Sequence, residues 1–203
     1  MADTKISALT AATAAAGADV LPIVQGGTTK KLTFTSLWAQ GVAAAGGFTN
    51  AARCMHTGGV PATQTTDGND TTPSTTETYF AEVHIDSNVT LTGIALFNGS
   101  AVSGNVCVAL ADSTGAIVAE CNATAQAGTD TYQRVPFTAT YAAVGPATYY
   151  ALVQFSSTSA RFNTHIVGNF GASKKTGETF DTFTTITPPT TFTTALGPIA
   201  SLY

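Results

Sequence analysis

Charged residues are scarce in this chain of 203 residues. Asp, Glu, Lys and Arg make up 10% of the sequence, against about 25% in an ordinary soluble domain. Only 8 residues are Lys or Arg and the formal net charge is −4, so the basic stripe that nucleic-acid binding needs is missing. No apolar run approaches the roughly 18 residues of a membrane-spanning helix. We therefore expect no nucleic-acid partner and no membrane insertion.

Cysteine is scarce as well, with Cys54, Cys107 and Cys121 the three present. The opening Met-Ala-Asp-Thr-Lys lacks the basic segment and the apolar core of a secretory signal. Secretion of a neutral domain would need such a signal, so we expect synthesis in a cytoplasm. There the cysteines are predicted to be reduced thiols rather than a disulfide framework.

Catalytic motifs are missing too. The chain has no Gly-x-Ser-x-Gly elbow, no nucleotide-binding loop and no His-Glu-x-x-His pair. A depolymerase would need clustered carboxylates on a long repetitive chain, whereas Asp and Glu number 12 here. We predict that the protein is not an enzyme and has no catalytic, cofactor-binding or metal-binding residues and no cofactor.

One row of metal-ligating side chains has a simpler explanation. Glu82, His84 and Asp86 share one face of one predicted strand, at a spacing of about 7 Å. Metal sites normally draw their ligands from several elements. A polar outer face, or a ring of repeated side chains at a symmetry axis, explains the row better.

Two other polar clusters and the tyrosines are also interpreted structurally. Residues 54–56, Cys-Met-His, have no second half of a zinc site. Residues 67–70, Asp-Gly-Asn-Asp, miss the ligand order of a calcium loop and predict a polar turn. A sugar-binding platform would need exposed rings in a row, and core packing is favoured instead for Tyr132, Tyr141, Tyr149 and Tyr150.

Thr, Ala, Gly and Ser take the place of charge. Thr is β-branched and suits strands, while the helix formers Glu, Lys and Arg are few. The composition therefore predicts an all-β protein with neutral surfaces. Such surfaces lack the single-sign repulsion that keeps subunits apart, so they suit permanent assembly.

Residues 1–48 are predicted to form a small N-terminal arm. Residues 20–25 are β-prone, the Gly-Gly-Thr-Thr of residues 26–29 supplies a tight turn, and residues 32–35 alternate like a returning strand. Together they predict a hairpin.

A short helix is expected after this hairpin. Ser36 is a suitable N-cap for a helix over residues 37–45. An arm of this size cannot bury a core of its own. We expect it to pack against another chain, and a frayed terminus is the alternative.

The stretch from Lys5 to Leu37 carries a resemblance. Its words are Ile6-Ser-Ala-Leu9, Asp19-Val-Leu-Pro-Ile-Val-Gln25, Gly26-Gly-Thr-Thr29 and Lys30-Lys-Leu-Thr33. This stretch resembles the short N-terminal segment by which tail fibres, tailspikes and related appendages of tailed bacteriophages attach to the virion. The resemblance covers about a sixth of the chain. It implies a place in a particle rather than a reaction, and it also implies a homotrimer.

The rest of the chain divides into three parts. Residues 49–78 are rich in Thr and Gly and predict a linker or a long loop. Residues 79–170 show short alternating strands with regular turn signals, the pattern of an antiparallel β-sandwich. The expected strands are 79–86, 89–97, 104–111, 116–122, 133–140, 147–155 and 161–170. The strand 147–155 is apolar on both parities, which predicts a central strand covered on both faces.

This sandwich block carries a second resemblance. Its words are Leu91-Thr-Gly-Ile-Ala-Leu-Phe-Asn-Gly99, Asp112-Ser-Thr-Gly115 and Gly145-Pro-Ala-Thr-Tyr-Tyr150. The block looks like the jelly-roll-type sandwiches of phage fibre and capsid-decoration proteins. Carbohydrate-binding modules share the architecture, so a module that recognises a host surface glycan is the alternative function.

Residues 171–203 are rich in Thr, Pro and Phe and predict an extended tail. Burying a Phe is worth roughly 1.5–3 kcal/mol, so its three Phe seldom stay in water. We expect the tail to lie across its own sandwich or across a neighbouring subunit.

These features predict a structural protein of a bacteriophage virion, assembled in the host bacterial cytoplasm. Residues 1–48 would dock on other virion proteins of the capsid, portal, neck or tail, and the sandwich would be displayed outward. A tail fibre, a head fibre or head decoration, and a neck or tail adaptor all fit this prediction.

The sequence also predicts a register. Asp112-Ser-Thr-Gly115 fits a three-residue hairpin loop with Gly115 in the left-handed conformation. That loop closes Asp112 against Ala116 and places Leu110 opposite Val118. It also places Cys107 directly opposite Cys121, within the range that a disulfide tolerates. A reducing cytoplasm still favours free thiols.

Overall fold

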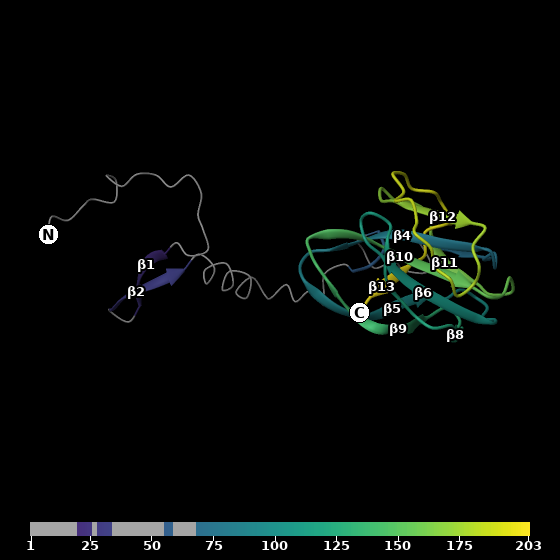
Figure 1. The fold of residues 1–203 in the computed structure, drawn as a ribbon, viewed down its shortest axis with the longest axis horizontal. Helices are drawn as coiled ribbons and strands as arrows, with labels where there is room; N and C mark the ends of the chain where they lie inside the picture. Colours follow the sequence, from purple (N-terminus) through teal and green to yellow (C-terminus); the bar gives the residue numbers. More distant parts are fainter. Residues whose placement is uncertain (1–19, 26–27, 34–54, 59–67) are drawn as a thin grey trace. The chain divides into compact units, whose positions relative to one another are not determined.

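The computed structural model describes residues 20–25, 28–33, 55–58 and 68–203, with side chains from residue 55 onward (Figure 1). The chain divides into two compact units, Met1–Thr49 and Asn50–Tyr203. Every regular element among the described residues is a strand, and every pair of strands within the sheets is antiparallel. The all-β prediction is therefore confirmed.

The described residues of the first unit form a pair of strands. β1 (Val20–Gln25) pairs with β2 (Thr28–Thr33), from Val20 opposite Thr33 to Gln25 opposite Thr28. The returning strand was expected over residues 32–35, but β2 begins at Thr28, so Thr28 and Thr29 belong to the strand and not to the turn. The predicted helix over residues 37–45 lies outside the described residues.

The second unit is built on a sheet of six strands. Its order is β12-β4-β10-β6-β7, and the short β8 also pairs with β6. The bounds are β4 Glu77–Ile85, β6 Asn105–Ala111, β7 Ile117–Glu120, β8 Thr124–Ala125, β10 Ala147–Phe155 and β12 Ala172–Thr176. β10 lies between β4 and β6, and its last seven residues are buried. This confirms the prediction of a central strand covered on both faces.

Two smaller sheets complete this unit. One has the order β13-β5-β9, and in the other β11 pairs with β3. The bounds are β3 Gly68–Thr71, β5 Val89–Phe97, β9 Tyr132–Ala143, β11 Phe162–His165 and β13 Ala200–Leu202. A bridge from Asn98 to Phe162 joins the end of β5 to β11.

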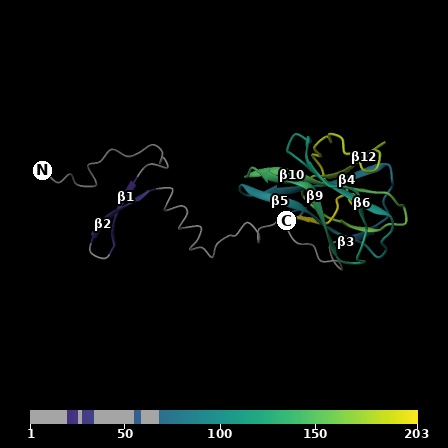
Figure 2. The same cartoon turned by 60° about the horizontal axis from the view of Figure 1, so that its bottom comes forward.

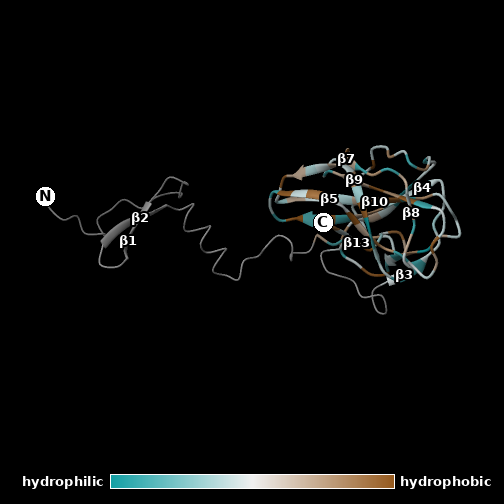
Figure 3. Cartoon of the chain, turned by 90° about the horizontal axis from the view of Figure 1, so that it is seen from below, coloured by the Kyte–Doolittle hydropathy of each residue, from teal (hydrophilic) through white to brown (hydrophobic). Residues whose placement is uncertain are grey.

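The main core lies between the six-stranded sheet and the smaller sheets. One cluster of buried side chains takes Val153 and Phe155 from β10, Ile94 and Leu96 from β5, and Phe162 from β11. The ring centroids of Phe155 and Phe162 are 4.8 Å apart. Figure 2 shows the strands of the second unit from a second direction, and in Figure 3 brown hydrophobic stretches alternate with teal and white along them.

The segment expected as an extended tail instead contributes β12 and β13, and part of the expected linker forms β3. Between β12 and β13, residues 177–191 form a strap over the second face of the six-stranded sheet. Ile186 of the strap is 3% exposed and packs with Phe80, Tyr150 and Leu152. The tail was expected to lie across its own sandwich or across a neighbouring subunit, and the strap lies on a sheet of its own chain.

The β6–β7 hairpin has the predicted loop and a different register. Asp112 N–H donates to the Ala116 carbonyl oxygen (2.9 Å), and Gly115 has a φ of 88°. A bulge then shifts the pairing, so that Leu110 faces Ala119 instead of Val118. The prediction that Cys107 directly faces Cys121 is therefore wrong, because Cys121 N–H donates to the carbonyl oxygen of Val108, one residue further along.

Candidate functional site

The outer face of the β13-β5-β9 sheet carries aromatic and polar side chains. Ile94, Leu96 and Val135 point into the core, so the residues that alternate with them face outward. On this outer face Phe97 is paired with Tyr132, and their rings stack with centroids 4.8 Å apart and an interplanar angle of 21°. Phe97 is covered, whereas Tyr132 remains 38% exposed.

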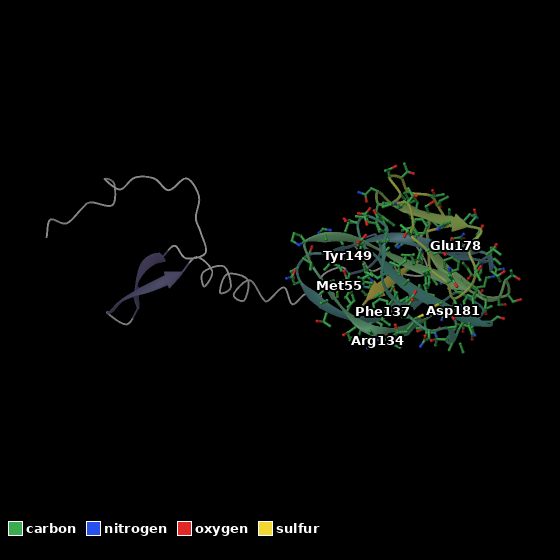
Figure 4. The ribbon with its side chains drawn as sticks, in the orientation of Figure 1. Met55, Arg134, Phe137, Tyr149, Glu178 and Asp181 are labelled. Carbon is green, nitrogen blue, oxygen red and sulfur yellow. The ribbon has the colours of Figure 1, made fainter. Side chains whose placement is uncertain are left out.

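A cation and a second tyrosine continue this outer face. Arg134, two residues after Tyr132 on β9, places its guanidinium carbon 4.9 Å from the centroid of the Tyr203 ring. The ring of Tyr203 lies over Gly93, where a side-chain Cβ would collide with the phenol. Figure 4 shows Arg134 and Phe137 along β9, of which only Phe137 is buried in the core.

An imidazole adjoins the same face. His56 forms a bridge with Ser201 of β13, and its ring centroid lies 6.5 Å from that of Tyr132. Its Nδ1 atom is buried and finds no hydrogen-bond partner among the described residues. Burial lowers the pKa of His56, so the neutral ring is favoured.

The chemistry that this outer face offers is binding. Tyr132 is partly exposed, with its ring stacked on Phe97 and the His56 ring edge-on to it. Arg134 supplies hydrogen-bond donors at the edge. Alternation along residues 93–97 and 132–136 could have indicated these positions, but the sequence gives no sign that Tyr203 lies beside them.

The other predicted tyrosines are structural. Tyr149 belongs to the main core and Tyr150 to the cluster under the strap, so they point to opposite faces of β10, as predicted. Tyr141 packs edge-on against Tyr149 with ring centroids 6.2 Å apart. Tyr132 is the one member of the predicted set with an exposed ring, so the prediction of core packing is wrong for Tyr132.

The predicted polar row does not converge on one point. Glu82 accepts a hydrogen bond from the backbone N–H of Gly171 (2.9 Å), while His84 Nε2 lies 3.5 Å from Asp86 Oδ1. Among the described residues, no group of three or more His, Cys, Asp and Glu side chains could hold a metal ion. The prediction of a polar turn at residues 67–70 is wrong for residues 68–70, which belong to β3; there Asp70 accepts two hydrogen bonds from Ser100, at 3.1 and 2.6 Å.

A shallow groove separates the edge strands β7 and β9. Its volume is about 410 Å³, and its lining includes Glu120, Thr138 and Phe183. Thr138 Oγ1 donates to the Glu120 carbonyl oxygen (3.0 Å), which ties the two edges together. We therefore interpret the groove as the boundary between the two sheets.

Comparisons with protein-family models, with curated proteins and with solved structures found no match for this chain. Among the described residues, no helix is long and apolar enough to cross a membrane.

Proposed function

We propose that this protein is a structural component of a tailed-bacteriophage virion. Residues 1–48 dock on other virion proteins, and the second unit is displayed outward as a β-sandwich of jelly-roll type. A fibre, a head fibre or decoration, and a neck or tail adaptor are the positions that fit. The protein assembles in the host bacterial cytoplasm and acts by binding rather than by catalysis.

The single observation that carries this proposal is the stretch from Lys5 to Leu37, whose words resemble the virion-attachment segment of phage appendages. β1 and β2 fall inside this stretch and pair as a separate unit from Asn50–Tyr203. A small strand pair without a core of its own gains stability by packing against a partner. The scarcity of charge, 10% of residues, supports permanent association with other subunits.

The sandwich part of the proposal is supported by the packing of the sheets. The main core joins β4, β6 and β10 to β5, β9 and β13. At one side Thr57 donates its N–H to Ala200 of β13 (2.9 Å) and also bridges to Val83 of β4. At the other side Thr138 and Glu120 connect β9 to β7. Two layers joined at both sides are typical of β-sandwiches.

Deletion of residues 1–48 tests the docking. The truncated protein should keep the circular dichroism spectrum and cooperative unfolding of the full chain but should no longer enter particles. A variant with residues 5–37 in scrambled order separates sequence-specific docking from mere length. Normal occupancy of particles by the truncated protein would refute the proposal.

Recognition of a host surface glycan is the second candidate, and the exposed ring of Tyr132 beside Arg134 favours it. Aromatic faces stack on sugar rings, and guanidinium groups donate to hydroxyls. In that case Tyr132→Ala abolishes binding to host cells while the melting temperature stays within a few degrees of wild type. Tyr141→Ala is the matched control, because its loss should lower stability without a specific effect on binding.

A further inference from the structure

Two cysteines lie in contact beneath the strap. Cys107 of β6 and Cys121, the residue after β7, are both free and buried, with 1% and 5% exposure. Their Sγ atoms are 3.0 Å apart. That separation is about 1 Å longer than a disulfide bond of roughly 2.05 Å, so small side-chain rotations would bring the sulfurs to bonding distance.

The end of the β6–β7 ladder creates this contact. β7 ends opposite Ala109, and Cys121 N–H still donates to the carbonyl oxygen of Val108 (2.9 Å). The N–H of Val108 does not continue the ladder but donates to Cys121 Sγ (3.0 Å). Because of the register shift, Cys121 lies opposite Val108 and not opposite Cys107, and its sulfur reaches the sulfur of Cys107 diagonally.

The two sulfurs have different surroundings. Cys121 Sγ receives the Val108 N–H and faces the Cys107 thiol, and this thiol lowers the pKa of Cys121 by hydrogen bonding. Cys107 Sγ lies near the carbonyl oxygen of Cys121 (3.2 Å) and Asp181 Oδ1 (3.3 Å). Its interaction with Cys121, together with burial, raises the pKa of the Cys107 thiol. Cys121 is therefore the better nucleophile, because the thiolate is the reactive form.

We propose that Cys107 and Cys121 form an intramolecular disulfide when the protein meets hydrogen peroxide. The Cys121 thiolate attacks one peroxide oxygen, the O–O bond breaks and hydroxide leaves, which gives a sulfenic acid. Cys107 then loses its proton to the Asp181 carboxylate, and its sulfur attacks Cys121 Sγ. The S–O bond breaks, and the departing hydroxide takes the proton from Asp181, while the hydroxide released in the first step takes the proton that Cys121 lost on ionisation. Two thiols and one peroxide thus give one disulfide and two waters.

This site is independent of the proposed function. The bond would close a loop around the β6–β7 hairpin, which reduces the freedom of the unfolded chain. For a loop of about 15 residues this effect corresponds to a rise in melting temperature of roughly 6–12 °C.

The experiment uses the full chain with Cys54→Ser, so that the two paired cysteines are the only thiols. Reduced protein is treated with hydrogen peroxide in its folded state, alkylated, digested and analysed by mass spectrometry. A linked peptide pair containing Cys107 and Cys121, with a raised melting temperature that a reductant reverses, is the expected result. Recovery of both cysteines as alkylated or over-oxidised residues in folded protein overturns the proposal.

Matched variants test the roles of the individual groups. Cys107→Ser should leave Cys121 to accumulate as a sulfenic acid that dimedone traps, while Cys121→Ser should show much less labelling at Cys107. Asp181→Asn should slow disulfide formation severalfold. Asp130→Asn is its control, because Asp130 also has a positive φ and is exposed but lies outside these contacts. Equal rates for these two aspartate variants would contradict the role of Asp181.

Discussion

Replacing Gln154 by Leu tests how the strap is held on the sheet. Gln154 lies on β10 and is 1% exposed. Its Nε2 donates to Thr78 Oγ1 (2.8 Å) and to the carbonyl oxygen of Thr182 (3.0 Å), and its Oε1 accepts the N–H of Asp181 (2.9 Å). Leu keeps most of the side-chain volume and makes none of these three hydrogen bonds.

The expected loss follows from these contacts. A hydrogen bond contributes about 0.5–1.5 kcal/mol net, so three contribute about 1.5–4.5 kcal/mol. Asp181 and Thr182 are exposed, and their backbone groups bind water once the strap lifts. The loss should therefore fall in the lower half of this range, at about 2 kcal/mol. For a unit of this size, that lowers the melting temperature by roughly 4–8 °C.

Urea denaturation measures the free energy of unfolding, and hydrogen exchange locates the change. The amides of Asp181 and Ile186 should exchange faster in Gln154→Leu, while those of β4 and β5 change only with the global stability. Thr179→Ala, at an exposed strap position, serves as the control. A stability loss below about 0.5 kcal/mol together with unchanged exchange in the strap would refute the reasoning.

Four further predictions concern the hairpin loop and the oligomeric state. Asp112→Ala should lower the free energy of unfolding by about 1–2 kcal/mol, since Asp112 Oδ1 accepts from the Thr114 N–H (2.8 Å), and urea denaturation with Asp112→Asn as control checks this. The hydrogen bonds from Thr114 lower the pKa of Asp112. This stabilisation is therefore present above the unfolded-state pKa of about 3.9 and is lost as pH falls through the folded-state pKa. Acid titration of Asp112→Asn should not show this loss. Gly115→Ala should lower the melting temperature, because φ is 88° and the new Cβ would collide with the Ile186 carbonyl oxygen, whereas Gly177→Ala, at φ 75° in open space, should cost less. Light scattering of the full chain should give a species near three times 20.6 kDa, and a monodisperse monomer would contradict the homotrimer.

The C-terminal segment gives no support to the predicted homotrimer. Its Phe side chains were expected to lie across their own sandwich or across a neighbouring subunit. In the structure Ile186 is buried, and Phe180 and Phe183 are partly buried against the sheets of the same chain. The prediction now depends on the resemblance of the N-terminal segment alone.

The strands that the sequence predicted are those with a strong local pattern. β5 and β10 match the expected ranges at both ends, because nine residues of mostly apolar chain are bounded by turn residues. β12 was not predicted, because Ala-Ser-Lys-Lys-Thr has no apolar alternation. It joins the sheet edge through backbone hydrogen bonds. β13 was not predicted either, because three residues are too few to show the alternation of a strand.

The other features that the sequence did not predict depend either on one extra residue in a strand or on contacts between distant parts of the chain. The bulge between β6 and β7 moves Leu110 from Val118 to Ala119, and no local pattern marks the extra residue. The face that carries Tyr132 and Arg134 also includes Tyr203, whose position depends on the pairing of residues 200–202 with residues 94–96. Such pairing is set by the tertiary fold and not by neighbouring residues.

The pairing of β13 with β5 has a consequence for biosynthesis. Leu202 lies opposite Ile94, and Lys175 of β12 lies opposite Thr78 of β4. β4 and β5 are therefore translated well before their partners β12 and β13. While the ribosome is still adding residues beyond β11, β4 and β5 each have one unpaired edge. Contacts between such distant residues slow folding, and unpaired strand edges favour aggregation. We therefore expect the open edges of β4 and β5 to be exposed to non-native pairing until β12 and β13 have been made.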